Sequence, residues 1–267
     1  MFWRIHKAIF KNRLNEAVKI LSAMGDEVQT ITKDEMSFIP LPNSFDSNKP
    51  SFAITTIQDA NMLIKTKADI RLCYDNHNYN VSTWISYLRE FGVVNSDCYF
   101  LPLSLVIRLR QDKFPIFIKP NGGNKLFTGF VANRIDDILS HPDIAFYLIN
   151  APETMCMINK SYQMPDAEWR LWIVDRKIAG YSPYSWSWGR KISLTEPPKT
   201  IMKLAEKVAN TEWQPDTIYT VDIADGINGA YNLPKIIEIN AGSTSGFYNA
   251  DLSKILLNIR NSISEGY

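Results

Sequence analysis

The sequence has few of the features that mark several common classes of protein. Its three cysteines, Cys73, Cys98 and Cys156, are odd in number and widely spaced, which fits neither a disulfide framework nor a zinc site and favours a reducing compartment. No window approaches the run of ~18 apolar residues that a membrane-spanning helix needs. The amino-terminal segment carries charged residues throughout and lacks the apolar core of a signal peptide. We therefore expect a cytoplasmic protein with no membrane partner.

Net charge is also nearly absent. The 29 Lys and Arg residues against 28 Asp and Glu give a formal charge of +1, so the composition does not indicate nucleic acid or an anionic membrane as a partner. A hydrophobic content of 45% and a charged content of 21% over 267 residues are typical of a globular protein with a sizeable core. The three histidines have no metal-like spacing, and the sequence does not indicate an oligomeric state.

Strand and helix patterns alternate over about the first hundred residues, which predicts a small α/β domain at residues 1–105. The later residues are richer in predicted hairpins, with a reversal at NGGNK and another at Asp175-Arg176. Strands are expected at 27–31, 51–56, 70–74, 115–119, 126–131, 144–149, 168–174, 177–184, 219–223 and 235–240. Helices are expected at 12–24, 61–67, 81–91, 135–140, 199–210 and 252–263.

The last two predicted strands carry oxygen-bearing side chains on one face. The segment between them, residues 224–234, contains Asp-Gly and Asn-Gly pairs, which favour a tight reversal and an antiparallel hairpin. A register with Asp222 opposite Glu238 also places Thr220 opposite Asn240. Two carboxylates and an amide oxygen so close together would repel without a cation, and such ligands suit Mg²⁺ that carries phosphates. Alternatively, these groups only solvate the open face of the hairpin.

Two earlier motifs offer positive charge for an anion. Lys119 ends a predicted strand and Lys125 follows two glycines, whose backbone amides can approach a phosphate closely. Arg170 shares a strand face with Glu168, and an arginine can grip a phosphate with two donors at once. The alternatives are an ordinary hairpin with solvated lysines and a Glu-Arg surface pair of little energetic consequence.

Two further segments are candidates for substrate binding. Small residues directly after Asn240, namely Gly242, Ser243, Ser245 and Gly246, can form an amide-lined anion pocket. Arg190, which follows an aromatic loop, offers a cation for a carboxylate. Ordinary turns use similar small residues, and a solvated loop is the alternative for Arg190.

Taken in order, IKPNGGNKLFTGFV, EWRLWIV, VDI and IIEINAGSTSGFY resemble the ATP-grasp superfamily, and most closely the phage and bacterial clade named for one arginine and two lysines. The resemblance covers about residues 106–260. It implies an α+β fold in which two α+β lobes, at residues 106–158 and 159–267, hold ATP and follow a small α/β pre-ATP-grasp domain. It also implies a bacterial or phage-infected host cell as the setting.

The resemblance further implies the residues that bind ATP and Mg²⁺. Arg170 and Lys125 are similar to catalytic groups that face the phosphates. The nucleotide-binding set is Lys119, Lys125, Met155, Met157, Ile158, Glu168 and Arg170, and the magnesium ligands are Asp222, Glu238 and Asn240. The glycine loop is shorter than in many members of the superfamily. An acidic ribose ligand is not evident, and Glu153, Asn159 and Asp166 compete for that role.

The activity implied by the resemblance is that of a carboxylate-amine ligase. Such an enzyme uses ATP to convert a small-molecule or peptide carboxylate into an acyl phosphate, which an amine attacks to form an amide or peptide bond. Two alternatives keep the fold. One is a kinase of a small hydroxyl compound, and the other is a non-catalytic nucleotide-binding module that acts through a protein partner.

Overall fold

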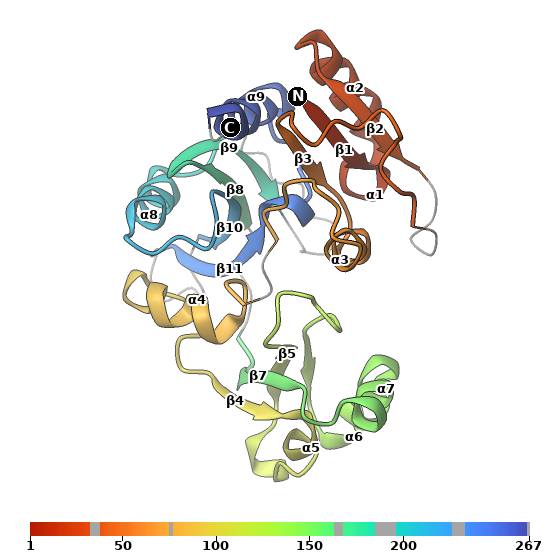
Figure 1. Ribbon diagram of the computed structural model, residues 1–267. Coiled ribbons are helices and arrows are strands. Elements are labelled where there is room, and N and C mark those ends of the chain that lie inside the picture. The colour runs from red at the N-terminus through yellow and green to blue at the C-terminus, as the bar shows by residue number, and fades with distance from the viewer. Residues whose placement is uncertain (33–37, 75–76, 163–167, 185–195, 226–232, 266–267) are drawn as a thin grey trace. The chain divides into compact units, whose positions relative to one another are not determined.

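A computed structural model of the chain (Figure 1) describes residues 1–32, 38–74, 77–162, 168–184, 196–225 and 233–265. Contacts divide the chain into two compact units. Unit 1 comprises Met1–Tyr74, Asp166–Ile223 and Glu238–Tyr267, and unit 2 comprises Asp75–Pro165 and Ala224–Ile237. The division into three parts at residues 105 and 158 stays a prediction. Within the described ranges, no helix combines the length and apolar character needed to cross a membrane.

The helices and strands of unit 1 form two sheets and the helices around them. In chain order they are β1 (Phe2–His6), α1 (Lys7–Phe10), α2 (Leu14–Ala23), β2 (Glu27–Ile31), β3 (Ser51–Ile54), α3 (Ile57–Lys65), β8 (Glu168–Val174), β9 (Lys177–Tyr184), α8 (Lys199–Asn210), β10 (Ile218–Ala224), β11 (Lys235–Ala241) and α9 (Leu252–Glu265). Strand β10 ends, and β11 begins, in unit 2.

Unit 2 is built around one sheet. Its elements are α4 (Val81–Leu88), β4 (Tyr99–Pro102), α5 (Leu103–Val106), β5 (Ile116–Pro120), β6 (Phe130–Ala132), α6 (Ile135–Leu139), α7 (Pro142–Asn150) and β7 (Met155–Lys160). The strand order is β4-β7-β5-β6, and neighbouring strands are antiparallel.

The small sheet of unit 1 is parallel, with the order β2-β1-β3. All five residues of β1 are buried, as expected for a central strand covered on both faces. Helix α2 packs Ala17 and Leu21 inward, and Gly25, at φ +78°, ends the segment in the left-handed conformation that glycine adopts without strain.

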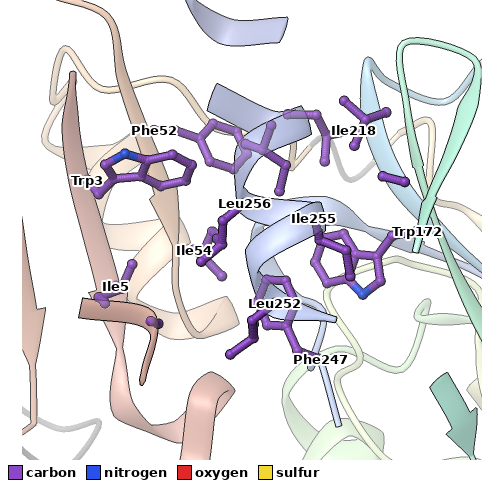
Figure 2. Packing of buried hydrophobic residues seen from close by; sticks show 14 of the residues in the cluster. Trp3, Ile5, Phe52, Ile54, Trp172, Ile218, Phe247, Leu252, Ile255 and Leu256 are labelled. Atoms are coloured by element: carbon purple, nitrogen blue, oxygen red, sulfur yellow. The ribbon is translucent and has the colours of Figure 1, made fainter. Parts of the chain in front are cut away.

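Helix α9 joins the two sheets of unit 1 into one hydrophobic core. Figure 2 shows its buried face between aromatic and aliphatic side chains of β1 and β3 on one side and of β8 and β10 on the other. Added side-chain atoms at Gly180 of β9 would lie 2.6 Å from Ile255, so a glycine there lets α9 approach the sheet. The labelled members of this core are Trp3, Ile5, Phe52, Ile54, Trp172, Ile218, Phe247, Leu252, Ile255 and Leu256.

The second sheet has the order β11-β10-β8-β9. Strands β8 and β9 form an antiparallel hairpin whose two turn residues, Asp175 and Arg176, have φ values of 46° and 61°, the conformation typical of a tight hairpin. The predicted bounds of β8, β9 and α8 are confirmed.

Two predicted strands do not form. Residues 144–149 belong to helix α7 rather than to a strand, because Pro142 begins the helix at its first turn and only Ile144 of the segment is fully buried. Short apolar runs do not distinguish a strand from a helix. Residues 70–74 form no strand in the described structure, where Arg71 makes an isolated bridge to Phe52. Strand β4 and helix α5 were not predicted.

A buried ion pair ties α3 to the parallel sheet. The Nε and Nη2 atoms of Arg4 donate to the two carboxylate oxygens of Asp59 at 2.8 and 2.6 Å, and Nη1 donates to Gln29 at 2.8 Å. Thr55 donates its hydroxyl to Asp59 at 2.6 Å. Burial raises the pKa of Asp59, but the hydrogen bonds from Arg4 and Thr55 outweigh it, so the pKa lies below its usual value.

We expect Arg4→Met to lower the free energy of unfolding by about 3–5 kcal/mol, because it leaves a buried carboxylate without its counter-ion. The double change Arg4→Met with Asp59→Leu should cost less than the single one. Since the pKa of Asp59 is lowered, the stability that the pair contributes is present near neutral pH and is lost as the pH falls through the folded-state pKa. Urea unfolding followed by circular dichroism measures each value.

The matched control is Lys49→Met, which removes an exposed ion pair with Asp46 at 4.0 Å and should change stability by less than about 1 kcal/mol. An Arg4→Met protein as stable as the control would contradict this account.

Candidate functional site

A buried arginine, carboxylate and amide meet on three adjacent strands of unit 1. Arg170 of β8 donates from Nε and Nη2 to the two oxygens of Asp222 on β10, at 2.8 and 2.7 Å. The amide nitrogen of Asn240 on β11 donates to the same carboxylate at 3.0 Å. The three residues are 6%, 2% and 5% exposed, so the pair is held in a dry, low-dielectric environment. The structure thus brings together three of the residues predicted from sequence.

Two further predicted carboxyl groups belong to this cluster. Glu168, two residues before Arg170 on β8, is buried, while Glu238 on β11 is half-buried. Burial, followed by the charges of Asp222 and Glu238, raises the pKa of Glu168 to about 8, although Arg170 acts in the opposite direction. Glu168 is therefore protonated at neutral pH, first because it is buried and second because the carboxylates of Asp222 and Glu238 lie near it.

Tyr248 covers the guanidinium of Arg170. Its ring centroid lies 5.2 Å from Cζ of Arg170, and its hydroxyl is 3.5 Å from Nη1. Tyr248 has φ +48°, a conformation that bulky residues rarely adopt. Sequence reasoning did not single out this residue, because a positive φ is predictable at glycine but not at tyrosine.

The turn Gly242–Thr244 is fixed to the parallel sheet by backbone bonds. Thr55, just after β3, donates its N–H to the carbonyl of Ser243 at 2.7 Å, and the N–H of Ser243 donates to the carbonyl of Cys73 at 3.2 Å. The Ser243 hydroxyl accepts the N–H of Cys73 at 3.0 Å. An added Cβ at Gly242 would lie 2.4 Å from the carbonyl oxygen of Ile218, so only glycine fits against β10.

The remaining predicted substrate residues lie near this turn or outside the described structure. The Ser245 hydroxyl donates to the carbonyl of Ala241 at 2.8 Å and lies 3.0 Å from the hydroxyl of Thr220. Gly246 is half-buried and precedes the aromatic pair that ends the motif. Arg190 lies outside the described residues. The side chains of Ser243 and Ser245 thus stabilise the turn, and their substrate role stays a prediction.

The two predicted phosphate lysines belong to unit 2. Lys119 is half-buried on β5, and Lys125 is exposed with φ +48° in the loop between β5 and β6. An added Cβ at Gly123 would lie 2.7 Å from Cβ of Tyr79, and one at Gly129 would lie 3.0 Å from Cβ of Lys119. The glycines therefore allow close packing of the loop, and the loop is longer than the predicted reversal because β6 begins only at residue 130.

The predicted adenine-binding segment is strand β7. Met157 and Ile158 are fully buried and pair with β4 on one side and β5 on the other, where Met157 lies opposite Lys119. Met155 is 41% exposed. The backbone in the middle of β7 is hydrogen-bonded to both neighbouring strands. Its carboxyl end is therefore the part of β7 whose backbone can hydrogen-bond to adenine.

A polar cluster lies at that carboxyl end. The amide nitrogen of Asn159 donates to Asn95 at 3.0 Å and to Asp97 at 3.1 Å. Asp97 also accepts the Tyr162 hydroxyl at 3.0 Å and pairs with Lys160 at 3.3 Å. Partial burial raises the pKa of Asp97, but the hydrogen bonds from Asn159, Tyr162 and Lys160 lower it below its usual value. Sequence reasoning missed Asp97 as a ribose candidate, because it lies far from β7 along the chain.

The structure adds little support for the three ribose candidates predicted from the sequence. Glu153 is exposed before β7, and Asp166 lies outside the described residues. Asn159 is 3% exposed and already holds two carboxyl or amide oxygens. All three stay predictions.

The donor set of Asp222, Glu238 and Asn240 fits magnesium by its chemistry, since all three offer hard oxygen ligands. No group of three His, Cys, Asp or Glu side chains arranged to hold a metal occurs among the described residues, so the amide oxygen of Asn240 is a necessary part of the set. Both oxygens of Asp222 accept from Arg170. A cation at Asp222 would therefore have to share this carboxylate with Arg170 or displace it.

Comparison with known proteins agrees with the fold. The chain matches, over residues 71–259, the family model for an ATP-grasp domain that is family 3 of the clade named for one arginine and two lysines. Curated protein sequences give no match.

Three solved structures illustrate the similarity of fold. D-cycloserine synthetase DcsG is 10% identical with a TM-score of 0.60, covering 98% of this chain and 99% of that chain. The D-alanine–D-alanine ligase from Bacillus anthracis complexed with ATP is 16% identical with a TM-score of 0.57, covering 100% and 98%. The macrocyclase MdnC from Microcystis aeruginosa MRC, bound with precursor peptide MdnA, is 13% identical with a TM-score of 0.53, covering 97% and 99%. These similarities confirm the predicted α+β ATP-grasp fold.

The raised pKa of Glu168 predicts a pH-dependent stability. Because the folded-state pKa is about 8 and the unfolded value is about 4.3, the folded state holds the extra proton between these values and stability falls as the pH rises through this window. Glu168→Gln should remove up to about 1.4 kcal/mol of this loss per pH unit. Urea unfolding at a series of pH values within this window, without nucleotide or Mg²⁺, measures the slope.

The matched control is Glu206→Gln on the exposed side of α8, which should leave the pH slope of the wild-type protein unchanged. Equal slopes for the wild type and Glu168→Gln would show that Glu168 ionises normally in the folded protein.

Proposed function

The chain belongs to the ATP-grasp superfamily, in family 3 of the clade named for one arginine and two lysines, and on that premise we propose that it is an ATP- and Mg²⁺-dependent ligase that joins a carboxylate to an amine. The observation that carries the proposal is the buried set Arg170, Asp222 and Asn240, with Glu168 and Glu238 beside it. Phosphoryl transfer needs positioned positive and negative groups more than a protein nucleophile. This set supplies such groups on the rigid strands of one sheet.

The proposed reaction has two steps. A carboxylate oxygen of the substrate bonds to the γ-phosphorus of ATP as the bond to the β-phosphate oxygen breaks, which releases ADP and leaves an acyl phosphate. The amine nitrogen then attacks the acyl carbon, the bond to the phosphate oxygen breaks, and the amine loses a proton. The products are an amide, ADP and inorganic phosphate.

In this proposal Arg170 changes partner. Magnesium, held by Asp222, Glu238 and Asn240, would supply charge that offsets the phosphoryl oxygens. When Arg170 leaves Asp222, its forked donors become available to a phosphoryl group. The ring of Tyr248 at 5.2 Å keeps the guanidinium over the site during the exchange.

Unit 2 would supply the nucleotide contacts. We assign the phosphates to Lys119, Lys125 and the backbone amides of the glycine loop, and the adenine to the backbone and side chains of Met155, Met157 and Ile158. The polar cluster around Asp97 is the ribose candidate that the structure adds. Catalytic roles fall to Arg170 and Lys125.

The substrates follow from the relatives only as classes. The similar structures include a D-cycloserine synthetase, a D-alanine–D-alanine ligase and a macrocyclase bound with a precursor peptide, so we propose a small-molecule or peptide carboxylate and an amine. The turn from Gly242 to Gly246, with Arg190, is the proposed substrate contact.

The free thiols Cys73, Cys98 and Cys156 support a cytoplasmic location.

The first test measures what ADP release requires. The protein, ATP and Mg²⁺ are combined with a panel of carboxylates, a panel of amines, or both. ADP should accumulate at a substantial rate only with both, and mass spectrometry should find the sum of the two substrates less one water. A phosphorylated hydroxyl compound would indicate a kinase instead, and nucleotide binding without turnover across the panel would indicate a non-catalytic module.

The second test removes the proposed metal ligands. Asp222→Asn and Glu238→Gln should each lower kcat by on the order of 100-fold or more, because the developing phosphoryl charge loses its counter-ion. Asp225→Asn, an exposed carboxyl just after β10, is the matched control and should keep full activity. Circular dichroism confirms that each variant is folded. Unchanged turnover in both active-site variants would remove the metal assignment.

A further inference from the structure

Two strained residues of unit 1 meet at one point. Lys11, just after α1, has φ +53° and Tyr248 has φ +48°, and the Lys11 ammonium lies 5.6 Å from the centre of the Tyr248 ring. Backbone strain of this kind persists only where the surroundings fix it, and it collects at ligand sites. The contact therefore needs an explanation beyond local chain folding.

The surroundings do fix both residues. Arg13 donates from Nη1 to the carbonyls of Tyr248 and Ala250 at 2.9 and 2.7 Å. Phe10, next to Lys11, stacks on Phe247, next to Tyr248, with ring centroids 4.9 Å apart. Phe247 in turn stacks on Trp172 of β8 at 4.4 Å. Figure 2 shows Phe247 and Trp172 in the core beside α9, so the segment that carries Lys11 is anchored to the strand that carries Arg170.

The position of this contact in the fold is that of a ligand site. Lys11 follows the carboxyl end of β1 by one short helix, and the strand order β2-β1-β3 reverses beside β1. In open α/β sheets, ligands bind outside the carboxyl ends of the strands at such a reversal. Tyr248 lies at the end of residues 242–248, and the turn in this segment accepts a hydrogen bond from Thr55, the residue directly after β3. Both residues thus lie at the ligand-binding end of the small sheet.

Charge at this point is unbalanced. Two cations contact the Tyr248 ring, Arg170 at 5.2 Å and Lys11 at 5.6 Å. Asp222 offsets the charge of Arg170 at 2.7 Å, and Glu16 offsets that of neighbouring Arg13 at 2.7 Å. Lys11 has no carboxylate partner in the part of the chain that the structure describes. An anion from outside the chain would complete the arrangement.

We infer that Lys11, resting on Tyr248, binds a second anionic group of the carboxylate substrate. The reacting carboxylate has to lie beside Arg170 and Asp222, where the proposed phosphoryl transfer occurs, and Lys11 contacts the same Tyr248 ring as Arg170. The substrate is then an acid with two negative groups, such as a dicarboxylate or an acidic amino-acid unit of a peptide. This inference rests on the proposed ligase function and names its substrate class.

The experiment compares acids with their neutral amides. ADP release is measured with succinate, L-aspartate, L-glutamate and Ala-Glu, and with the matched amides succinamate, L-asparagine, L-glutamine and Ala-Gln, each with the same amine panel. The acids should show a KM about tenfold or more lower than the amides, as expected for one charge-assisted contact. Lys11→Met should remove that difference without a comparable fall in kcat, and Lys11→Arg should restore much of it.

Lys7→Met is the matched control, because Lys7 is an exposed lysine at the start of the helix that Lys11 follows, and it should keep the wild-type KM. The inference is overturned if amides serve as well as acids and Lys11→Met changes nothing, while the ligase proposal then stands. It is also overturned if Lys11→Met raises the KM for ATP instead. If no carboxylate of either panel supports ADP release, the ligase proposal itself is overturned.

Discussion

The site depends on one buried ion pair. Arg170 and Asp222 hold each other by two short hydrogen bonds inside a sheet where both are nearly inaccessible to water. Either charge alone would carry a desolvation cost of several kcal/mol, so β8 and β10 must be neighbours in a register that lets the two side chains meet. The Asn240 amide extends the same constraint to β11. The geometry of the proposed phosphoryl-transfer site thus follows from electrostatic balance within the fold.

The same balance explains the protonated Glu168. Burial of Glu168, together with the nearby charges of Asp222 and Glu238, favours its protonated form, while the charge of Arg170 opposes this. A proton on Glu168 is the smallest change that brings the cluster near neutrality. A site with this surplus of acidic groups has capacity for an added cation, and that capacity is what the proposed magnesium role uses. The aromatic stack of Trp172, Phe247 and Phe10 lies beside it in the core of unit 1.

Strong periodicity made much of the fold predictable. Strand β8 and helix α8 have the predicted bounds, because the Asp175-Arg176 turn ends the apolar run of β8 and a 3.6-residue apolar repeat marks α8. Helix α7 was misread because its apolar run is too short to show a period. The sequence also placed Arg170, Asp222 and Asn240 on strands, but it could not show that the arginine would occupy the carboxylate, since pairing across strands depends on tertiary contacts.

The backbone conformation of single residues is the other feature that the sequence did not predict. Lys11 and Tyr248 take positive φ although neither is glycine. No local signal in the sequence indicates this, because contacts between segments far apart along the chain, Arg13 with Tyr248 and Phe10 with Phe247, hold the two turns. The proposed phosphate chemistry and the proposed substrate recognition therefore depend on different kinds of structural element in this chain. Apart from Lys125 and the glycine loop, the groups proposed for phosphoryl transfer sit on paired strands, which hold them to a fixed geometry. The groups proposed to choose the substrate sit on turns whose strain is fixed by neighbours, so a few substitutions there can change specificity while the strand-borne chemistry is kept.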